Sequence, residues 1–238
     1  YNYIMKSTIL DKTKLVNSVF SKVHKKYDLM NDIMSLGVHR IWKSKFIDWM
    51  NPHVNSKLID VASGTGDIAK LFSKRNSNFS KITCVEPNNK MLEVGEKNLK
   101  KLKNINWVKA QAEKLPVKDN TYDYYSISYG IRNVNDINKT LREAYRVLKP
   151  GGRFMCLEFS KIDNEALNFF YKQYSKTIPI IGKYVVGDAQ PYEYLIKSID
   201  QFYNQKQMIE LMNNNGFSNT EYRNLSNGVS AIHSGWKI

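Results

Sequence analysis

From Leu58 onward, short apolar runs alternate with amphipathic stretches along most of the chain. This alternation is typical of βα units that stack into a mostly parallel sheet, because each strand is followed by a helix that returns the chain to the same edge. A chain of 238 residues, 42% of them hydrophobic, is long enough to form one such domain around its own core. The apolar runs predict strands at residues 57–62, 81–86, 105–110, 122–128 and 152–159.

The remaining segments give local signals of their own. Residues 137–152, INKTLREAYRVLKPGG, place Leu141, Ala144 and Leu148 on one helical face and end in a Lys-Pro-Gly-Gly stop. Near the C-terminus, two strand-like runs flank Asn227-Gly228, which is a strong hairpin signal. We therefore expect the sheet to end in an antiparallel pair. A helical extension precedes Leu58, and an insert rich in Phe and Tyr follows the fifth strand.

Charge and cysteine content limit the partners and the compartment. The formal net charge is +14, and nearly all of the basic excess lies within residues 1–158. Such a surface suits nucleic acid or an anionic membrane, although lysine-rich faces are more often simply solvated. No apolar run approaches the roughly 20 residues that span a bilayer, so we expect a soluble or peripheral protein. Cys84 and Cys156 lie in apolar strand-like runs, which favours buried thiols in a reducing compartment over a disulfide or a metal site.

Residues 58–67, LIDVASGTGD, are typical of a strand that enters a turn of small residues and then a helix. In such a turn, backbone N–H groups and a helix N-terminus face the ligand, and a glycine such as Gly64 permits close approach. A dinucleotide fold would require G-x-G-x-x-G, whereas the spacing here is D-x-A-x-G-x-G, which argues against a dehydrogenase. The pattern resembles the nucleoside-binding loop of class I S-adenosylmethionine-dependent methyltransferases.

Polar residues also stand where the next three predicted strands end. Glu86 follows Gly64 by 22 residues, about the spacing at which an acidic side chain binds ribose hydroxyls. Gln111 and Ala112 follow the third strand, where an amide can both donate to and accept from an adenine edge, and Ser128 ends the fourth strand. Each residue alone could be a strand cap or a polar turn. Ligands of open α/β sheets bind at the carboxyl ends of the strands, so the combination predicts a cofactor site.

Longer stretches resemble one family within this class, the ubiquinone/menaquinone biosynthesis C-methyltransferases. The resemblance covers nearly the whole chain, and Ala62 in the turn is usual for that family. The family commonly has Asp at the position of Glu86 and Asn at that of Gln111, so both side chains here are one methylene longer with the same chemistry. The stretches are YDLMNDIMSLGVHRIWK (27–43), DVASGTGD (60–67), SISYGIRNVNDINKTLREAYRVLKPGG (126–152), CLEFSK (156–161) and GVSAIHSGWKI (228–238).

This resemblance implies a Rossmann-like, seven-stranded class I methyltransferase sheet with an antiparallel C-terminal hairpin. It also implies a polyprenylated benzoquinol or demethylmenaquinol as the substrate, methylated on a ring carbon. We expect one domain, 1–238, with a helical lid at 1–56, a cofactor-binding core at 57–159, a substrate-side insert at 160–205 and a C-terminal helix and strand pair at 206–238. By the same resemblance, S-adenosylmethionine would be bound by Thr65, Glu86, Gln111, Ala112 and Ser128, with Gly64 in the turn.

The stretch SYGIRNVND, residues 128–136, places a cation where the fourth strand leaves the sheet. A loop arginine is usually only solvated, but a fixed charge there would stabilise phenolate as it develops on the quinol. We therefore assign Arg132 to that oxygen, and Asn133 to brace Arg132 or the substrate. Arginine stays protonated, so the proton acceptor is water, Tyr27 at the head of the lid segment, Asp28 or Glu158, with a water held by Arg132 favoured. His39 and His233 could titrate near neutrality, but we assign neither a role.

The aromatic insert and the basic charge suggest that the protein binds its substrate at a membrane surface. The insert is either helical core or an apolar trough for a polyprenyl tail, and basic residues elsewhere would rest on anionic headgroups. We expect peripheral membrane association in the cytoplasm or the mitochondrial matrix, and a quinone-biosynthesis complex or a homodimer stays open. A nucleic-acid methyltransferase would usually carry an Asn/Asp-Pro-Pro-aromatic loop in place of SYGIRN, so we expect no nucleic-acid partner. A non-catalytic scaffold is the other alternative, and the retained cofactor positions argue against it.

Overall fold

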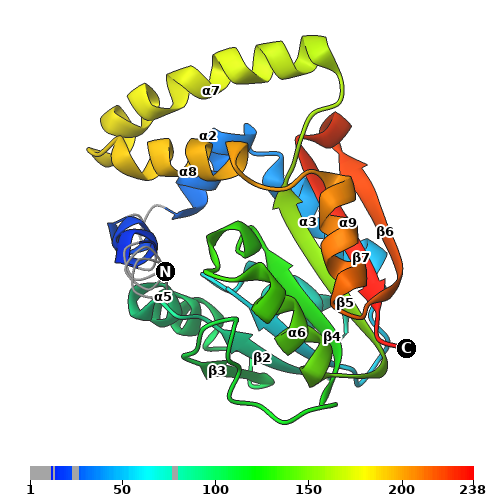
Figure 1. Ribbon diagram of the computed structural model, residues 1–238. Coiled ribbons are helices and arrows are strands. Elements are labelled where there is room, and N and C mark those ends of the chain that lie inside the picture. The colour runs from blue at the N-terminus through cyan, green and yellow to red at the C-terminus, as the bar shows by residue number, and fades with distance from the viewer. Residues whose placement is uncertain (1–11, 13, 23–26, 77–79) are drawn as a thin grey trace, which may run out of the picture.

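The computed structural model describes residues 12, 14–22, 27–76 and 80–238 (Figure 1). At its centre is a seven-stranded sheet in which five neighbouring strands run parallel and β7 runs antiparallel to both of its neighbours. This sheet confirms the expected Rossmann-like fold with an antiparallel C-terminal hairpin. In spatial order the strands are β3 (Ile105–Val108), β2 (Lys81–Val85), β1 (Lys57–Val61), β4 (Tyr122–Ser128), β5 (Leu148–Phe159), β7 (Ser230–Trp236) and β6 (Ser218–Leu225).

The predicted boundaries hold to within a few residues except at the start of β5. Helix α6 (Ile137–Val147) ends before the Lys-Pro-Gly-Gly segment, because Leu148 already has extended backbone with φ −72° and ψ 142°. The segment therefore opens the strand, with Gly151 at φ +77° donating to the carbonyl of Lys237 at 2.7 Å. The hairpin prediction at Asn227-Gly228 is confirmed, since the short helix η3 (Ser226–Gly228) joins β6 to β7.

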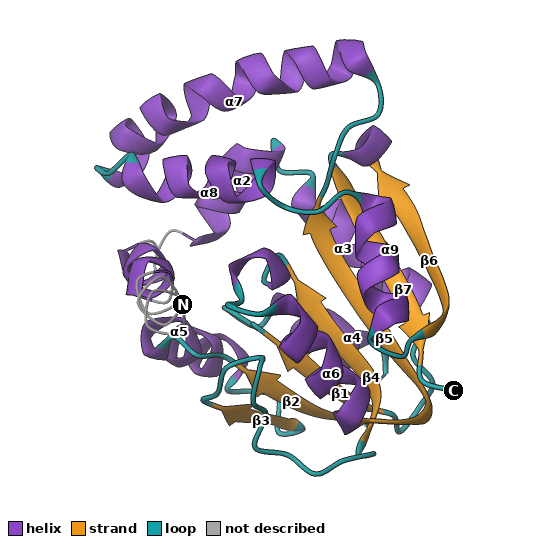
Figure 2. Cartoon of the chain, viewed as in Figure 1, coloured by secondary structure: helices purple, strands orange, loops and turns teal. Residues whose placement is uncertain are grey.

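Helices cover both faces of the sheet (Figure 2). Adjacent residues of β1 point to opposite sides, as strand geometry requires. Leu58 packs in the cluster formed with α3 (His39–Met50) and α4 (Asp67–Arg75), and Ile59 in the cluster formed with α6 and α9 (Gln205–Asn214). Both cysteines are buried free thiols on central strands, as predicted. Helix α5 (Asn89–Leu99) lies against β3.

The aromatic insert forms α7 (Glu165–Val186) and α8 (Gln190–Asp200), which pack with α2 (Tyr27–Ser35) beyond the ends of β4 and β5 (Figure 1). The hydroxyl of Tyr174 on α7 donates to the carbonyl of Ile33 on α2. Helices α7 and α8 approach closely at Gly182, where an added Cβ would lie 2.2 Å from the ring of Tyr192. The insert is therefore a packed helical layer, and it lies at the carboxyl ends of the strands, where the site residues were predicted.

Candidate functional site

The loop after β1 and the loop after β4 touch at the carboxyl edge of the sheet. Ala62 has φ 54° and Gly64 has φ 55°, so the first loop turns through the left-handed region at both residues. A Cβ added at Gly130 in the second loop would lie 2.5 Å from the Cβ of Ala62. A small residue at 62 and a glycine at 130 are thus required for this packing. Ala62 lines both of two adjoining cavities, and Gly130 lines the larger of them.

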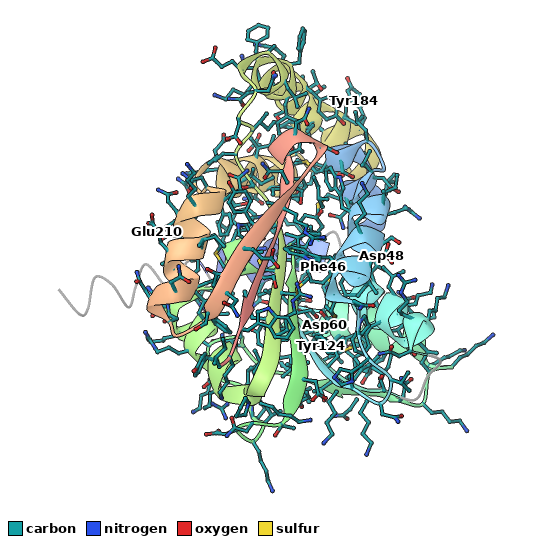
Figure 3. The ribbon with its side chains drawn as sticks, turned by 90° about the vertical axis from the view of Figure 1, so that its right-hand side faces the viewer. Phe46, Asp48, Asp60, Tyr124, Tyr184 and Glu210 are labelled. Carbon is teal, nitrogen blue, oxygen red and sulfur yellow. The ribbon has the colours of Figure 1, made fainter. Side chains whose placement is uncertain are left out.

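Asp60, on β1, is a buried carboxylate just before the first loop. One oxygen, Oδ1, accepts the hydroxyl hydrogen of Ser126 at 2.6 Å, and Oδ2 has no hydrogen-bond partner among the described residues. Figure 3 shows Asp60 in the interior of the molecule, below Phe46 of α3. Burial raises the pKa of Asp60 to about 7. Sequence reasoning treated Asp60 only as the first residue of the motif, although a carboxylate inside an apolar strand was a signal for a site.

Glu86, predicted to bind ribose hydroxyls, lies directly after β2 and is buried. One of its oxygens accepts the backbone N–H of Gly64 and the other that of Asn88, both at 2.9 Å. Burial raises its pKa to about 7, and the two N–H bonds partly offset the effect. A carboxylate oxygen can accept more than one hydrogen bond, so Glu86 remains able to accept hydroxyl donors while it ties the two loops together.

The structure brings all six predicted cofactor-binding residues to the two adjoining cavities. The larger has a volume of about 100 Å³ and is lined by Gly64, Glu86, Gln111 and Ala112. The smaller, of about 20 Å³, is lined by Gly64, Thr65 and Ser128. Sequence reasoning missed Asn17 and Phe20, which line the larger cavity from the helical segment 14–22, because nothing in that segment marks a contact so distant along the chain.

The polar atoms around the cavities suit S-adenosylmethionine. The hydroxyl oxygen of Ser128 is buried without a hydrogen-bond partner among the described residues, as is Oδ2 of Asp60. Buried polar atoms are rarely left unpaired unless they serve a ligand or water. The cofactor is a cation with hydroxyl and amino donors, and Glu86 and Asp60 supply matching acceptors. The binding roles of the six residues remain predictions, and the donor and acceptor set fits the group.

Arg132, predicted to face the substrate, lies in the short helix η2 (Ile131–Asn133) and is engaged in a buried ion pair. Its Nη1 donates to Oε1 of Glu158 at 2.5 Å and to the carbonyl of Tyr129 at 2.8 Å. The side chains of Arg132 and Glu158 are 3% and 0% exposed. Burial raises the pKa of Glu158, and the charge of Arg132 opposes that rise. Arg132 also lines a groove of about 1030 Å³ together with Tyr194 and Ser198 of α8.

The other residues considered for catalysis occupy different places. Asn133 lines the larger cavity and accepts a hydrogen bond from the hydroxyl of Tyr194 at 2.9 Å, so it links that cavity to α8. Tyr27 and Asp28 begin α2, and their side chains lie outside the described part of the structure. His39 pairs with Asp32 at 2.8 Å.

His233 on β7 is a buried residue outside both cavities. Burial lowers its pKa to about 4. The imidazole is therefore neutral at pH 7. Neither of its ring nitrogens has a hydrogen-bond partner among the described residues.

Sequence comparison relates nearly the entire chain to known proteins. A sequence model described as the ubiE/COQ5 methyltransferase family matches residues 7–237. A ubiquinone/menaquinone biosynthesis C-methyltransferase UbiE of Rickettsia bellii is 50% identical over 236 residues, which are 96% of this chain and 94% of the relative. A protein of the same description from Brucella abortus is 46% identical and covers 96% of this chain and 87% of its own.

Solved structures with low sequence identity share the fold. A methyltransferase of Thermotoga maritima, described as a possible histamine N-methyltransferase, superposes with a TM-score of 0.68 at 20% identity, covering 93% of this chain and 99% of its own. A phosphoethanolamine N-methyltransferase of Haemonchus contortus, solved with S-adenosyl-L-methionine, gives 0.62 at 15% identity, covering 82% and 52%. The sheet is therefore that of class I S-adenosylmethionine-dependent methyltransferases, as predicted.

Proposed function

The chain belongs to the ubiE/COQ5 methyltransferase family, and from this premise we propose that it methylates a ring carbon of a polyprenylated quinol. It is an S-adenosylmethionine-dependent C-methyltransferase of ubiquinone/menaquinone biosynthesis. The observation that carries the proposal is the identity of 50% over nearly the full length of both chains. The acceptors that surround the two cavities support it independently. The substrate is a 2-methoxy-6-polyprenyl-1,4-benzoquinol, a demethylmenaquinol, or both.

The reaction joins a methyl carbon to a ring carbon and releases one ring proton. When bound, S-adenosylmethionine would supply a methyl group that its sulfonium already activates. S-adenosylhomocysteine is the leaving group. The protein therefore has to orient the ring and stabilise the quinol oxygen as it becomes phenolate. Arg132 supplies the positive charge for that oxygen. Glu158 positions the guanidinium through their ion pair, and Asn133, which accepts a hydrogen bond from Tyr194, braces Arg132 or the substrate. A water held by Arg132 accepts the hydroxyl proton as the phenolate forms. The ring proton is released when the methylated ring regains aromaticity, and the oxygen is then protonated again.

Expression in a host that lacks quinone C-methylation tests this function. We expect lipid extracts to regain the methylated quinone, identified by mass spectrometry, because this chain would replace the missing step. The product also shows whether the benzoquinol, the demethylmenaquinol or both are accepted. Unmethylated quinone in cells that contain the folded protein would contradict the proposal. A host carrying the empty vector is the control.

We also propose that the protein binds an anionic membrane through the outer face of α7. No helix in the described part of the chain is long and apolar enough to cross a membrane. On α7, however, Phe169, Phe170, Ile180 and Tyr184 are exposed, Tyr184 by 87%. Lys172, Lys176 and Lys183 are exposed beside them at helical spacing, and Glu165 is the single acidic residue in the sequence of α7. Apolar side chains beside a row of lysines suit the interface of an anionic bilayer.

Neutralising this lysine row should weaken membrane binding. Each lysine near an anionic surface contributes about 1 kcal/mol, so the variant Lys172→Gln/Lys176→Gln/Lys183→Gln should bind vesicles of phosphatidylglycerol and phosphatidylcholine at least about tenfold more weakly. Sedimentation should also show wild-type binding falling as ionic strength rises. The matched control replaces three exposed lysines near α5, Lys90, Lys97 and Lys100. Equal losses in both variants would mean that α7 is not the docking face.

A further inference from the structure

Helix α8 contacts both residues of η2 that the proposed chemistry uses. The hydroxyl of Tyr194 donates to Oδ1 of Asn133 at 2.9 Å, and Nε of Arg132 donates to the hydroxyl oxygen of Ser198 at 3.4 Å. Tyr194 and Ser198 are four residues apart in α8, so their side chains lie on the same face of the helix. The second helix of the aromatic insert therefore holds η2 from one side through two hydrogen bonds.

The hydrogen bond from Tyr194 fixes the orientation of the Asn133 amide. Oδ1 of an amide can only accept, so the Tyr194 hydroxyl is the donor and Oδ1 faces α8. Nδ2 lies on the other side of the amide, where it donates to the carbonyl of Tyr129 at 3.4 Å. An amide nitrogen carries two hydrogens, and the second has no acceptor among the described residues. Asn133 lines the larger cavity, so this N–H group is left for a ligand.

Arg132 also keeps a donor that the rest of the protein does not use. Within the described part of the chain, its Nη2 makes no hydrogen bond, and none joins its side chain to that of Asn133. The groove that Arg132 lines adjoins the larger cavity. Three residues line both spaces: Gln111, Glu113 and Val134. A ring bound where the two spaces meet can therefore receive one donor from Arg132 and one from Asn133.

We propose, on the premise of the proposed function, that Tyr194 is a positioning residue that holds the Asn133 amide, so that its free N–H donates to the quinol oxygen next to Arg132. Arg132 then stabilises the developing phenolate with its charge, and Asn133 adds a preorganised donor to the same oxygen. Burial raises the pKa of Tyr194 above its ordinary value of 10.0, so the hydroxyl keeps its proton and remains a donor at neutral pH. Tyr194 acts only through Asn133 and does not contact the substrate.

Single-turnover methyl transfer to a short-tailed quinol, with quinol and S-adenosylmethionine both saturating, tests this assignment. Tyr194→Phe removes only the hydroxyl and should slow transfer by about three- to tenfold, the usual loss for one neutral hydrogen bond, with the affinity for S-adenosylhomocysteine unchanged. Tyr192→Phe is the matched control and should transfer at the wild-type rate. Tyr192 is buried on the same helix, and its hydroxyl has no hydrogen-bond partner among the described residues. Thermal unfolding checks that each variant is folded.

Asn133→Ala separates positioning from a merely structural role of Tyr194. It removes the amide that Tyr194 holds and should slow transfer by about tenfold or more, because the lost donor serves a charged oxygen. The double variant Tyr194→Phe/Asn133→Ala should be no slower than Asn133→Ala alone. A tyrosine that only packs α8 would slow both backgrounds by the same factor, which overturns the assignment. Wild-type transfer by Tyr194→Phe or by Asn133→Ala also overturns it and leaves the proposed function intact. Failure of the wild type to methylate any quinol overturns both.

Discussion

Replacing Arg132 with glutamine is expected to slow methyl transfer by about a hundredfold or more, the usual loss for one preorganised donor at a developing charge. Affinity for S-adenosylhomocysteine should change little, because a charge that acts only as phenolate develops contributes to turnover and not to cofactor binding. Lysine should rescue poorly, since Nη1 and Nε of the planar guanidinium reach Glu158, Tyr129 and Ser198 together. The measurement is single-turnover methyl transfer to a short-tailed quinol by Arg132→Gln and Arg132→Lys.

The buried ion pair requires a second variant as a control. Removing one partner of a buried pair costs about 3–5 kcal/mol of stability, because the other charge is left uncompensated. Arg132→Gln could therefore be slow simply because it unfolds. The double variant Arg132→Gln/Glu158→Gln carries no unpaired charge at this position and should recover most of the lost stability in urea while remaining slow. Near-wild-type transfer by a well-folded double variant would show that Arg132 only balances Glu158.

The cofactor side of the site could be predicted from the sequence because strand ends determine it. Parallel strands place their carboxyl ends at one edge, so residues such as Glu86 and Ser128 meet there whatever the details of packing. The glycine-rich turn carried the same information, since Gly64 has a φ of 55°, which favours glycine, and the close approach of Gly130 to Ala62 requires small residues. Periodicity and turn chemistry are local properties, and the fold class follows from them.

The environment of Arg132 could not be predicted in the same way. Its partner Glu158 is 26 residues away, and the two meet only because β4 and β5 pair in parallel with Ser128 opposite Leu157. A sequence pattern gives the strands along the chain but not which side chains pair beyond the strand ends. The same limit applies to the ion pair between the buried Lys43 and Asp67, because it depends on how α3 packs on α4. The start of β5 was misplaced because Lys-Pro-Gly-Gly stops a helix and also permits a strand to begin.

Replacing Glu86 with alanine is expected to weaken S-adenosylhomocysteine binding by about 1.5–3 kcal/mol, the typical loss of a charged hydrogen-bond acceptor. Glu86 is buried and accepts the N–H groups of Gly64 and Asn88, so alanine removes an acceptor that is held in place by both loops. Aspartate, the residue common in the family, should retain most of the affinity. Calorimetric titration of Glu86→Ala and Glu86→Asp measures the difference, and unchanged affinity in the alanine variant would remove Glu86 from the cofactor site.

The same carboxylate should make cofactor affinity rise with pH across neutrality. Burial raises the pKa of Glu86 from 4.5 to about 7, so the charged acceptor forms as pH rises through that value. The stability of the unliganded protein should instead fall as pH rises, because the folded state holds the proton of Glu86 more tightly than the unfolded chain does. That contribution to stability is complete below pH 4.5 and is lost as pH rises through about 7.

Calorimetric titrations of the wild type at pH 6, 7 and 8 should show cofactor affinity that increases with pH, because the charged form of Glu86 is the stronger acceptor. Burial raises the pKa of Asp60 to about 7 as well, so Glu86→Gln should flatten only part of the slope. A Glu86→Gln profile as steep as that of the wild type would assign the pH dependence to Asp60 alone.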